Sequence, residues 1–281
     1  MRHQIFLRVG PVGFRIGSDW HAPIAALDAL YRDYPRPDFA DYTVRLEATS
    51  PLRRWLRPSV RTLGDYNLPD SAPLPLAQGL LAAEMGMNLQ VALGHRRHLL
   101  LHAAVVARGD RAVLLSGVSG AGKSTLALML SQRGWRFLGD EFALIDPVSG
   151  WAHPFPRPIS LKNESLGVIP SDSLTGPRQS GTPKGEVRHV APDSAAIAAM
   201  DVPARPALLI FPRFGQPLAL HGMAPTETFV RLTQASTNYV ALGEAGFRAL
   251  TRLRSEVPAV ALDYPDGESG VAAVESIWSR L

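Results

Sequence analysis

Cysteine is absent from this chain of 281 residues. Without cysteine the protein has no disulfide bond, no thiolate-bound zinc or iron–sulfur cluster and no thiol nucleophile, which suits a reducing compartment. The eight histidines form no HExxH or comparable zinc-ligand spacing. The sequence therefore shows no metal site of the zinc-protease type.

Long apolar runs are also lacking. The longest stretch, around residues 99–107, is far shorter than the ~20 residues of a membrane-spanning helix. The N-terminal apolar segment is interrupted by Arg8, so it is unlike a secretory signal. A composition of 46% hydrophobic and 19% charged residues is typical of a globular protein with a sizeable core. We expect a cytoplasmic protein without a membrane partner.

The excess of positive charge is small, because Lys and Arg number 29 and Asp and Glu number 25, a net charge of +4. This balance is weak evidence for nucleic acid, which we do not expect as a partner. A basic and aromatic cluster at Arg53–Arg61 could bind an acidic peptide or a nucleic acid, although such runs are more often a solvated face. The sequence leaves open whether the chain forms a homo-oligomer.

Lysine is scarce, because only three of the 29 basic residues are lysines. A chain that otherwise uses arginine is expected to keep lysine where a compact, flexible ammonium is needed. Lys123 lies in Gly117-Val-Ser-Gly-Ala-Gly-Lys-Ser124, a Walker A phosphate-binding loop. Its glycines let successive N–H groups converge on a phosphate at a helix N-terminus. We predict ATP or GTP binding by Gly117, Val118, Ser119, Gly120, Ala121, Gly122, Lys123, Ser124 and Thr125.

Catalytic and metal-binding candidates lie in and around this loop. Lys123 is predicted to bridge the β- and γ-phosphates, and Ser124 to place its hydroxyl on Mg²⁺. Asp140 and Glu141 end the next apolar strand, where a carboxylate can bind magnesium or act as a base. His102 is a catalytic candidate on the strand paired with the one entering the loop, although a lone histidine among apolar residues is more often part of the core. The predicted catalytic residues are thus Asp140, His102 and Lys123, and the predicted metal ligands Ser124, Asp140 and Glu141.

The pattern of apolar residues predicts two parts. Residues 1–95 are expected to form a small α+β module that could recognise a substrate, and residues 96–281 an α/β domain. The second part is predicted to begin with one strand over 99–107. It also contains a polar loop over 170–195 and a helix across much of 226–255.

From about Leu101 to Ile169 the sequence resembles the HPr kinase/phosphorylase family, whose kinase domain shares its phosphate-loop architecture with phosphoenolpyruvate carboxykinase. The resemblance rests on Leu101-His102, Gly117–Ser124, Gln132-Arg133-Gly134 and Gly139-Asp140-Glu141, which stand in the family's order. It implies a P-loop kinase domain of this type at residues 96–281. It also implies that Asp140 takes the proton from an acceptor serine hydroxyl as that hydroxyl attacks the γ-phosphate, with His102 nearby.

The chain departs from HPr kinase at a second motif. Where the family carries Glu-Ile-Arg-Gly-Leu-Gly, this chain has Lys162-Asn-Glu-Ser-Leu-Gly167, so the sequence leaves open whether the chain phosphorylates HPr or catalyses the reverse reaction. It looks like the divergent HPr-kinase-related group found with peptide-modification systems. Lys162, Lys184 and Arg188 are predicted to contact the nucleotide, the last two from a polar loop that could close over it, and Arg213 is a secondary candidate.

The leading interpretation is a Mg²⁺-dependent kinase acting on a serine-type hydroxyl of a peptide or small protein. A small-molecule kinase is an alternative, since adenylylsulfate kinases carry a similar loop, but they usually place a longer helix before the acidic strand end. A transport ATPase is disfavoured because the chain has no Leu-Ser-Gly-Gly-Gln signature. A non-catalytic nucleotide-binding regulator stays open.

Overall fold

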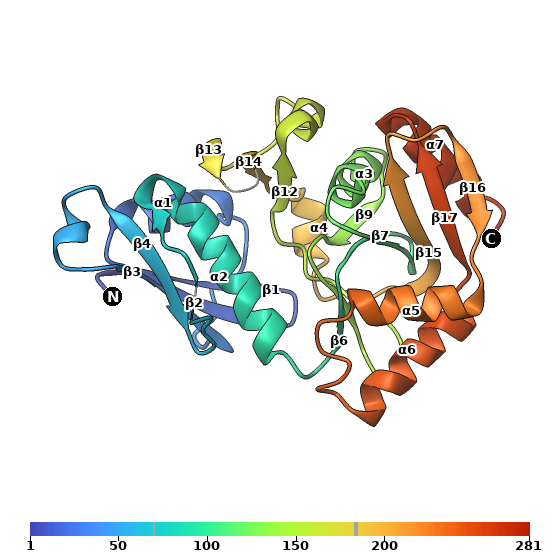
Figure 1. The fold of residues 1–281 in the computed structure, drawn as a ribbon, viewed down its shortest axis with the longest axis horizontal. Helices are drawn as coiled ribbons and strands as arrows, with labels where there is room; N and C mark the ends of the chain where they lie inside the picture. The colour runs from blue at the N-terminus through green and yellow to red at the C-terminus, as the bar shows by residue number, and fades with distance from the viewer. Residues whose placement is uncertain (70, 183–184) are drawn as a thin grey trace. The chain divides into compact units, whose positions relative to one another are not determined.

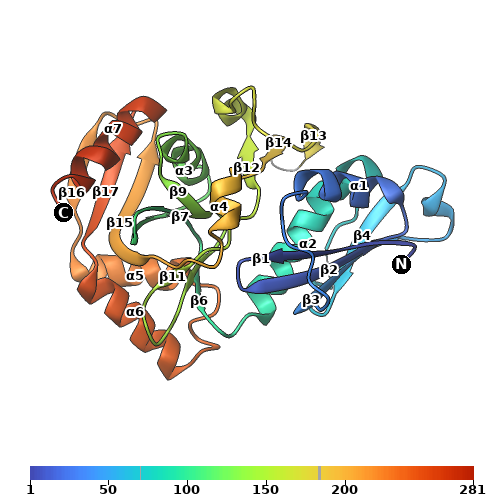
Figure 2. The same ribbon diagram turned by 180° about the vertical axis from the view of Figure 1, so that it is seen from behind.

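The computed structural model describes residues 1–69, 71–182 and 185–281 and has a mixed α/β fold with several sheets (Figures 1 and 2). The chain divides into two compact units. One consists of Met1–His95 and Ser160–Ile197, and the other of Arg96–Ile159 and Ala198–Leu281. The structure thus groups residues 160–197 with the N-terminal residues, whereas the sequence pattern predicts them in the second part. The functional division into two domains stays a prediction. Among the described residues, no helix is both long and apolar enough to cross a membrane.

The first unit is built on a five-stranded sheet in the order β1-β2-β3-β4-β5. Strands β1 and β2 form a hairpin, and β3 runs parallel to β2 after the crossover helix α1. Helix α2 packs on β3 and β4 (Figure 1). The elements are β1 (His3–Val9), β2 (Val12–Ser18), α1 (His21–Leu30), β3 (Tyr42–Ala48), β4 (Ser59–Gly64), β5 (Leu74–Pro75) and α2 (Gly79–Gly94), with short 3₁₀ helices at Leu52–Arg54 and Leu76–Gln78.

A three-stranded sheet in the order β12-β14-β13 follows in residues 159–190. The prediction of a polar loop over 170–195 was wrong here, because β13 and β14 pair with each other in antiparallel fashion. Their glycine-rich, polar sequence shows too little alternation of apolar and polar residues to predict strands. The elements are β12 (Ile159–Lys162), a 3₁₀ helix (Asn163–Val168), β13 (Gln179–Thr182), β14 (Gly185–Val190) and α4 (Ser194–Ala198).

The second unit contains a six-stranded sheet in the order β16-β17-β15-β8-β7-β9. Strands β8, β15 and β17 are parallel, whereas β7 is antiparallel to both β8 and β9. Strand β9 therefore runs in the same direction as β8, and the carboxyl ends of β8, β9, β15 and β17 meet at one edge. The strands are β7 (Ala103–Arg108), β8 (Arg111–Ser116), β9 (Arg136–Gly139), β15 (Arg205–Phe214), β16 (Ala219–Gly222) and β17 (Ala259–Tyr264).

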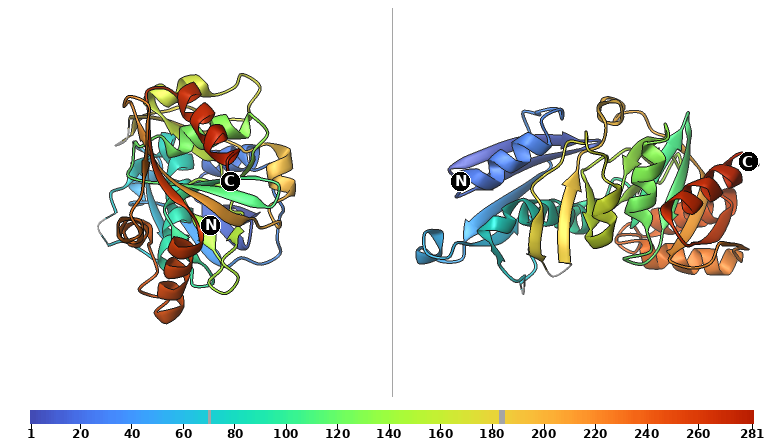
Figure 3. Two further views of the ribbon diagram at one scale, coloured as in Figure 1. Left: turned by 90° about the vertical axis from the view of Figure 1, so that its right-hand side faces the viewer. Right: turned by 90° about the horizontal axis from the view of Figure 1, so that it is seen from above.

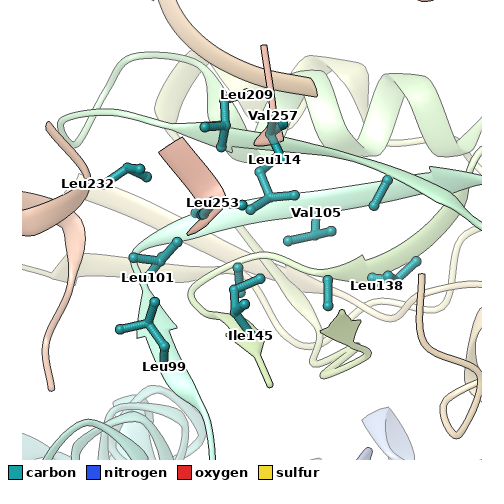
Figure 4. Close-up of a cluster of buried hydrophobic side chains, with 14 of the residues drawn as sticks. Leu99, Leu101, Val105, Leu114, Leu138, Ile145, Leu209, Leu232, Leu253 and Val257 are labelled. Atoms are coloured by element: carbon teal, nitrogen blue, oxygen red, sulfur yellow. The ribbon is translucent and has the colours of Figure 1, made fainter. Parts of the chain in front are cut away.

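Helices pack on both faces of this sheet (Figures 1 and 3). On one face, α5 (Pro225–Ala235) and α6 (Glu244–Glu256) join a buried cluster with Leu114 and Leu209 of the central strands (Figure 4). On the other face lie α3 (Lys123–Ser131) and α7 (Gly267–Trp278), where Arg111 of β8 stacks 4.7 Å from the ring centre of Trp278. The single helix predicted over 226–255 was wrong, because the chain breaks between α5 and α6 and begins α6 after Gly243, whose φ is +59°.

A small sheet in the order β11-β10-β6 completes the second unit. Strand β6 (Leu99–Leu101) pairs with β10 (Ala143–Ile145), which pairs with β11 (Ala152–His153). The single strand predicted over 99–107 was therefore wrong, because β6 and β7 belong to different sheets. The chain changes sheets at His102, whose N–H donates to the carbonyl of Ala235 over 2.8 Å instead of continuing the β6 ladder.

Candidate functional site

The glycine-rich loop lies between β8 and α3, at the sheet edge where the carboxyl ends of the parallel strands meet. Gly120 and Gly122 have φ values of +86° and +93°, a backbone region that residues with a Cβ rarely adopt. A Cβ on Gly122 would also collide with the Tyr264 hydroxyl. The loop therefore requires glycine at position 122 for two separate reasons.

Tyr264, the last residue of β17, contacts the glycine-rich loop through its hydroxyl group. Its buried hydroxyl donates to the carbonyl of Ala121 over 3.5 Å. Burial raises the pKa of the Tyr264 phenol well above its ordinary value, so the hydroxyl stays a neutral donor. Sequence reasoning missed this residue; its only signal is its place at the end of a strand parallel to β8.

Lys123 is folded back onto the loop. Its side chain is buried, with 7% of the residue exposed, and Nζ donates to the carbonyls of Gly117 over 2.7 Å and Val118 over 3.0 Å. Hydrogen bonds to carbonyl oxygens offset the cost of taking an ammonium out of water. The arrangement holds a positive charge inside the curve of the loop.

Ser124 and Asp140 meet at the start of α3. The Ser124 hydroxyl donates to Oδ1 of Asp140 over 2.8 Å, and Asp140 is only 6% exposed. Both atoms are hard oxygen donors of the kind that Mg²⁺ prefers, and two neighbouring ligands of an octahedral Mg²⁺ lie about 2.9 Å apart. The spacing of the two oxygens therefore fits a shared magnesium ion.

Glu141, the next residue after Asp140, lies against His102. The imidazole Nδ1 of His102 is 3.1 Å from the Glu141 carbonyl oxygen and 3.7 Å from its carboxylate oxygen Oε2. The hydroxyl of Ser116, the last residue of β8, donates to the carbonyl of His102 over 3.3 Å. The structure thus brings Lys123, Ser124, Asp140, Glu141 and His102 into one region of the second unit, and their catalytic and ligand roles stay predictions.

Two further charged residues lie at the ends of β15 and β17. Arg213 and Asp263 form a two-pronged ion pair, with both nitrogen–oxygen distances 2.6 Å, and His221 Nε2 lies 3.6 Å from Asp263. The hydrogen bond from Arg213 holds the pKa of Asp263 below its usual range, and the same bond raises the pKa of Arg213. Arg213 is thus neutralised by a carboxylate at the same edge as the loop.

No family model matches this chain, and no curated protein matches it. Among solved structures, the chain is similar to the HPr(Ser) kinase/phosphatase from Coxiella burnetii, at 12% sequence identity. The match covers 64% of this chain and 92% of that one, with a TM-score of 0.28. A TM-score this low does not show a shared fold or a shared function.

Arg157 is a buried charge beside this region that sequence reasoning missed. It is 5% exposed, and it follows Phe155, which bridges to Gly139 at the end of β9 and whose N–H donates to the carbonyl of Leu138. The segment that carries Arg157 therefore runs alongside the residues that lead into Asp140. An arginine between two prolines has no periodic pattern, so only its charge in an otherwise apolar stretch could have marked it.

Of the three residues outside the loop that were predicted to contact the nucleotide, Lys162 and Arg188 belong to the first unit, and Lys184 lies outside the described residues. The backbone of Lys162 is held by Ser165, whose hydroxyl donates to the Lys162 carbonyl over 2.7 Å and accepts from its N–H over 2.8 Å. Arg188 donates to the carbonyl of Gly176 over 3.1 Å. Their contact with a nucleotide stays a prediction.

Proposed function

We propose that this chain is a Mg²⁺-dependent kinase, a divergent relative of HPr kinase, that transfers the γ-phosphate of ATP or GTP to a serine-type hydroxyl of a peptide or small protein. The observation that carries the proposal is the 2.8 Å hydrogen bond from Ser124 to Asp140. It joins the residue after the loop lysine to the carboxylate at the end of the next strand. A hydroxyl after the loop lysine and a carboxylate at a strand end are the groups that hold Mg²⁺ beside the phosphates in P-loop enzymes.

The proposed reaction needs phosphate binding, metal binding and proton transfer. The loop N–H groups and Lys123 hold the β- and γ-phosphates, while Ser124, Asp140 and Glu141 hold Mg²⁺, which neutralises phosphate charge when bound. The acceptor oxygen forms a bond to the γ-phosphorus as the bond to the β–γ bridging oxygen breaks. The nucleoside diphosphate leaves with that electron pair, and the hydroxyl proton passes to Asp140.

Acceptor recognition is assigned to the N-terminal residues 1–95. The cluster Arg53–Arg61 carries Trp55 with 76% of its surface exposed, next to Arg54, whose guanidinium lies 5.6 Å from the indole ring centre. Exposed aromatic and arginine side chains are the residue types that most often anchor peptides. These features support an acidic or mixed peptide as the acceptor.

The test is phosphate transfer from γ-labelled ATP and GTP to candidate serine peptides, with mass spectrometry to locate the phosphate. Asp140→Asn should keep nucleotide binding, measured without Mg²⁺, and reduce transfer by about 10²–10⁴-fold. Asp110→Asn, a change of a carboxylate in the β7–β8 turn, should leave both unchanged. Transfer that is unaffected by Asp140→Asn would remove Asp140 from its role. Transfer only to small hydroxyl compounds would favour a small-molecule kinase, and binding without any transfer a regulator.

A further inference from the structure

A second cluster of ionisable side chains lies in the second unit, away from the glycine-rich loop. His98, Asp146 and His153 each place a ligand atom within 4.8 Å of the other two. Within the described ranges, it is the one group of three or more such side chains that could hold a metal ion. None of the three belongs to the site described above.

The register of the small β11-β10-β6 sheet explains why these residues meet. Leu99 pairs with Ile145 in the antiparallel β6–β10 ladder, so the next residues outward, His98 and Asp146, face each other. His153 pairs with Leu144, two residues before Asp146 on β10. Because side chains alternate along a strand, His98, Asp146 and His153 project to the same face.

The opposite face of the same sheet belongs to the apolar core. The strand residues that alternate with the cluster are buried with the six-stranded sheet and α6, and Figure 4 shows Leu99, Leu101 and Ile145 among them. On the cluster's own face, Leu100 and Leu144 are fully buried beside it. The two imidazoles and the carboxylate thus stand together at the rim of an apolar surface.

Hydrogen bonds hold the Asp146 carboxylate and the backbone of His98 in place. Oδ1 of Asp146 accepts from the N–H groups of Val148 over 2.8 Å and Ser149 over 2.7 Å. The carbonyl of His98, which is 7% exposed, accepts from the amide of Asn238 over 2.9 Å. The rings of His98 and His153 lie 4.8 Å apart at a tilt of 52°. Ligands that are fixed in this way lose little freedom when an ion binds.

We propose that His98, Asp146 and His153 bind a divalent transition-metal ion of the zinc class. Two imidazoles and one carboxylate are a common zinc ligand set, with water in the remaining position. Donors around a tetrahedral zinc ion lie about 3.4 Å apart, so small side-chain rotations close the site. Mg²⁺ prefers oxygen ligands and does not compete for it.

The zinc-class ion links the three strands of the small sheet, because each strand or its flanking residue supplies one ligand. Strands β6 and β10 carry His98 and Asp146 at one end and lead to His102 and Glu141 at the other. Metal bound at the first end therefore stabilises the ladder that positions the second. Binding itself does not depend on the proposed kinase activity.

The test is a calorimetric titration of the untagged full-length chain with Zn²⁺ in excess Mg²⁺, after removal of metals with a chelator. We expect one equivalent of zinc per chain. His153→Gln and Asp146→Asn should each lower the affinity for zinc by about 100-fold or more. Asparagine keeps the oxygen that accepts from the N–H groups of Val148 and Ser149 but removes the negative charge. The control is His21→Gln, which removes half of the other histidine pair, His3 and His21, with ring centres 5.3 Å apart. This change should leave the affinity unchanged.

Two further measurements decide the outcome if a variant folds poorly. Co²⁺, used in place of Zn²⁺, should give the visible absorption of a four- or five-coordinate site with nitrogen ligands in the wild-type chain. Zinc at 100 times its Kd should raise Tm by about 5–10 °C, and by much less in the His153 variant. No zinc binding, or binding that both variants retain, would overturn the proposal and mark the cluster as ordinary packing. Binding lost in His21→Gln would assign the ion to the other pair.

Discussion

The Ser124 hydroxyl donates a hydrogen bond to Oδ1 of Asp140 over 2.8 Å. The two residues come from different elements, since Ser124 is the second residue of α3 and Asp140 directly follows β9. They meet because β8 and β9 run in the same direction, so the loop after β8 and the carboxylate after β9 reach the same edge. This edge is where ligands usually bind in α/β sheets.

The first prediction concerns the hydroxyl of Ser124. Ser124→Ala removes this hydroxyl. The factor by which Mg²⁺ lowers the Kd for the nucleotide should therefore be about 10–100 times smaller in this variant than in the wild type. Ser124→Thr keeps a hydroxyl and should retain most of the effect. The measurement is the Kd of a fluorescent ATP or GTP analogue with Mg²⁺ and with a chelator. An alanine variant with an unaltered response to Mg²⁺ would exclude Ser124 as a ligand.

The second prediction separates the two constraints on the loop glycines. Gly120→Ala meets only an unfavourable φ, because no heavy atom lies within 4 Å of the added Cβ. Gly122→Ala meets both a positive φ and the Tyr264 hydroxyl. Gly122→Ala should therefore reduce the free energy of unfolding more than the ~1–3 kcal/mol that we expect of Gly120→Ala.

Tyr264→Phe provides the matched control, because it removes the colliding oxygen and leaves the ring. In that background Gly122→Ala should cost less than it does with tyrosine but still more than Gly120→Ala, because the added Cβ would lie 3.2 Å from Cβ of Phe214 and 3.3 Å from Cζ of residue 264. The measurement is urea unfolding of all four combinations at positions 122 and 264. Equal costs for Gly122→Ala with tyrosine and with phenylalanine would contradict the collision.

The glycine-rich loop between a strand and a helix could be predicted from sequence because its signal is local. Eight consecutive residues fix the glycines, the lysine and the serine, and the apolar run before them predicts β8. Asp140 could be placed for the same reason, as a carboxylate that ends the next apolar run. In each case one short segment contains the information.

The residues that sequence reasoning missed depend on pairing between distant segments. Nothing local marks the break at His102, where the backbone bonds to Ala235 and the chain passes into a second sheet. The cluster of His98, Asp146 and His153 exists only because the β6–β10–β11 register aligns three separate strand ends. Arg157 lies beside the end of β9 through a bridge of Phe155 to Gly139 that no spacing rule predicts.

The third prediction is a pH dependence at the ion pair of Arg213 and Asp263. Arg213 holds the pKa of Asp263 below its unfolded value of about 4, so the pair contributes its full stability above that pH. The contribution is lost as the pH falls through the lower, folded value. Arg213→Gln should therefore lower Tm at pH 6 and progressively less below pH 4.

The measurement is Tm against pH for the wild type and Arg213→Gln. Arg248→Gln serves as the control, because Arg248 forms an exposed pair with Glu244 within one helix and should give little difference at any pH. His221, 3.6 Å from Asp263, is present in both proteins and does not create the difference between them. A gap in Tm that stays constant down to pH 3 would contradict the assignment.

The last prediction concerns Asn238, which holds β6 in place through its side-chain amide. It is 2% exposed; its Oδ1 accepts from the N–H of Leu100 and its Nδ2 donates to the carbonyl of His98, each over 2.9 Å. Asn238→Ala deprives two buried backbone groups of these partners, which should cost about 2–4 kcal/mol of unfolding free energy in urea. Asn238→Asp keeps the acceptor but turns the donor into a charged acceptor facing the His98 carbonyl, so it should cost more. Thr251→Ala, on the exposed side of α6, should change stability by less than about 0.5 kcal/mol. If Asn238→Ala were as mild as Thr251→Ala, the backbone contacts of β6 with β10 and with Ser236 and Thr237 would suffice to hold it.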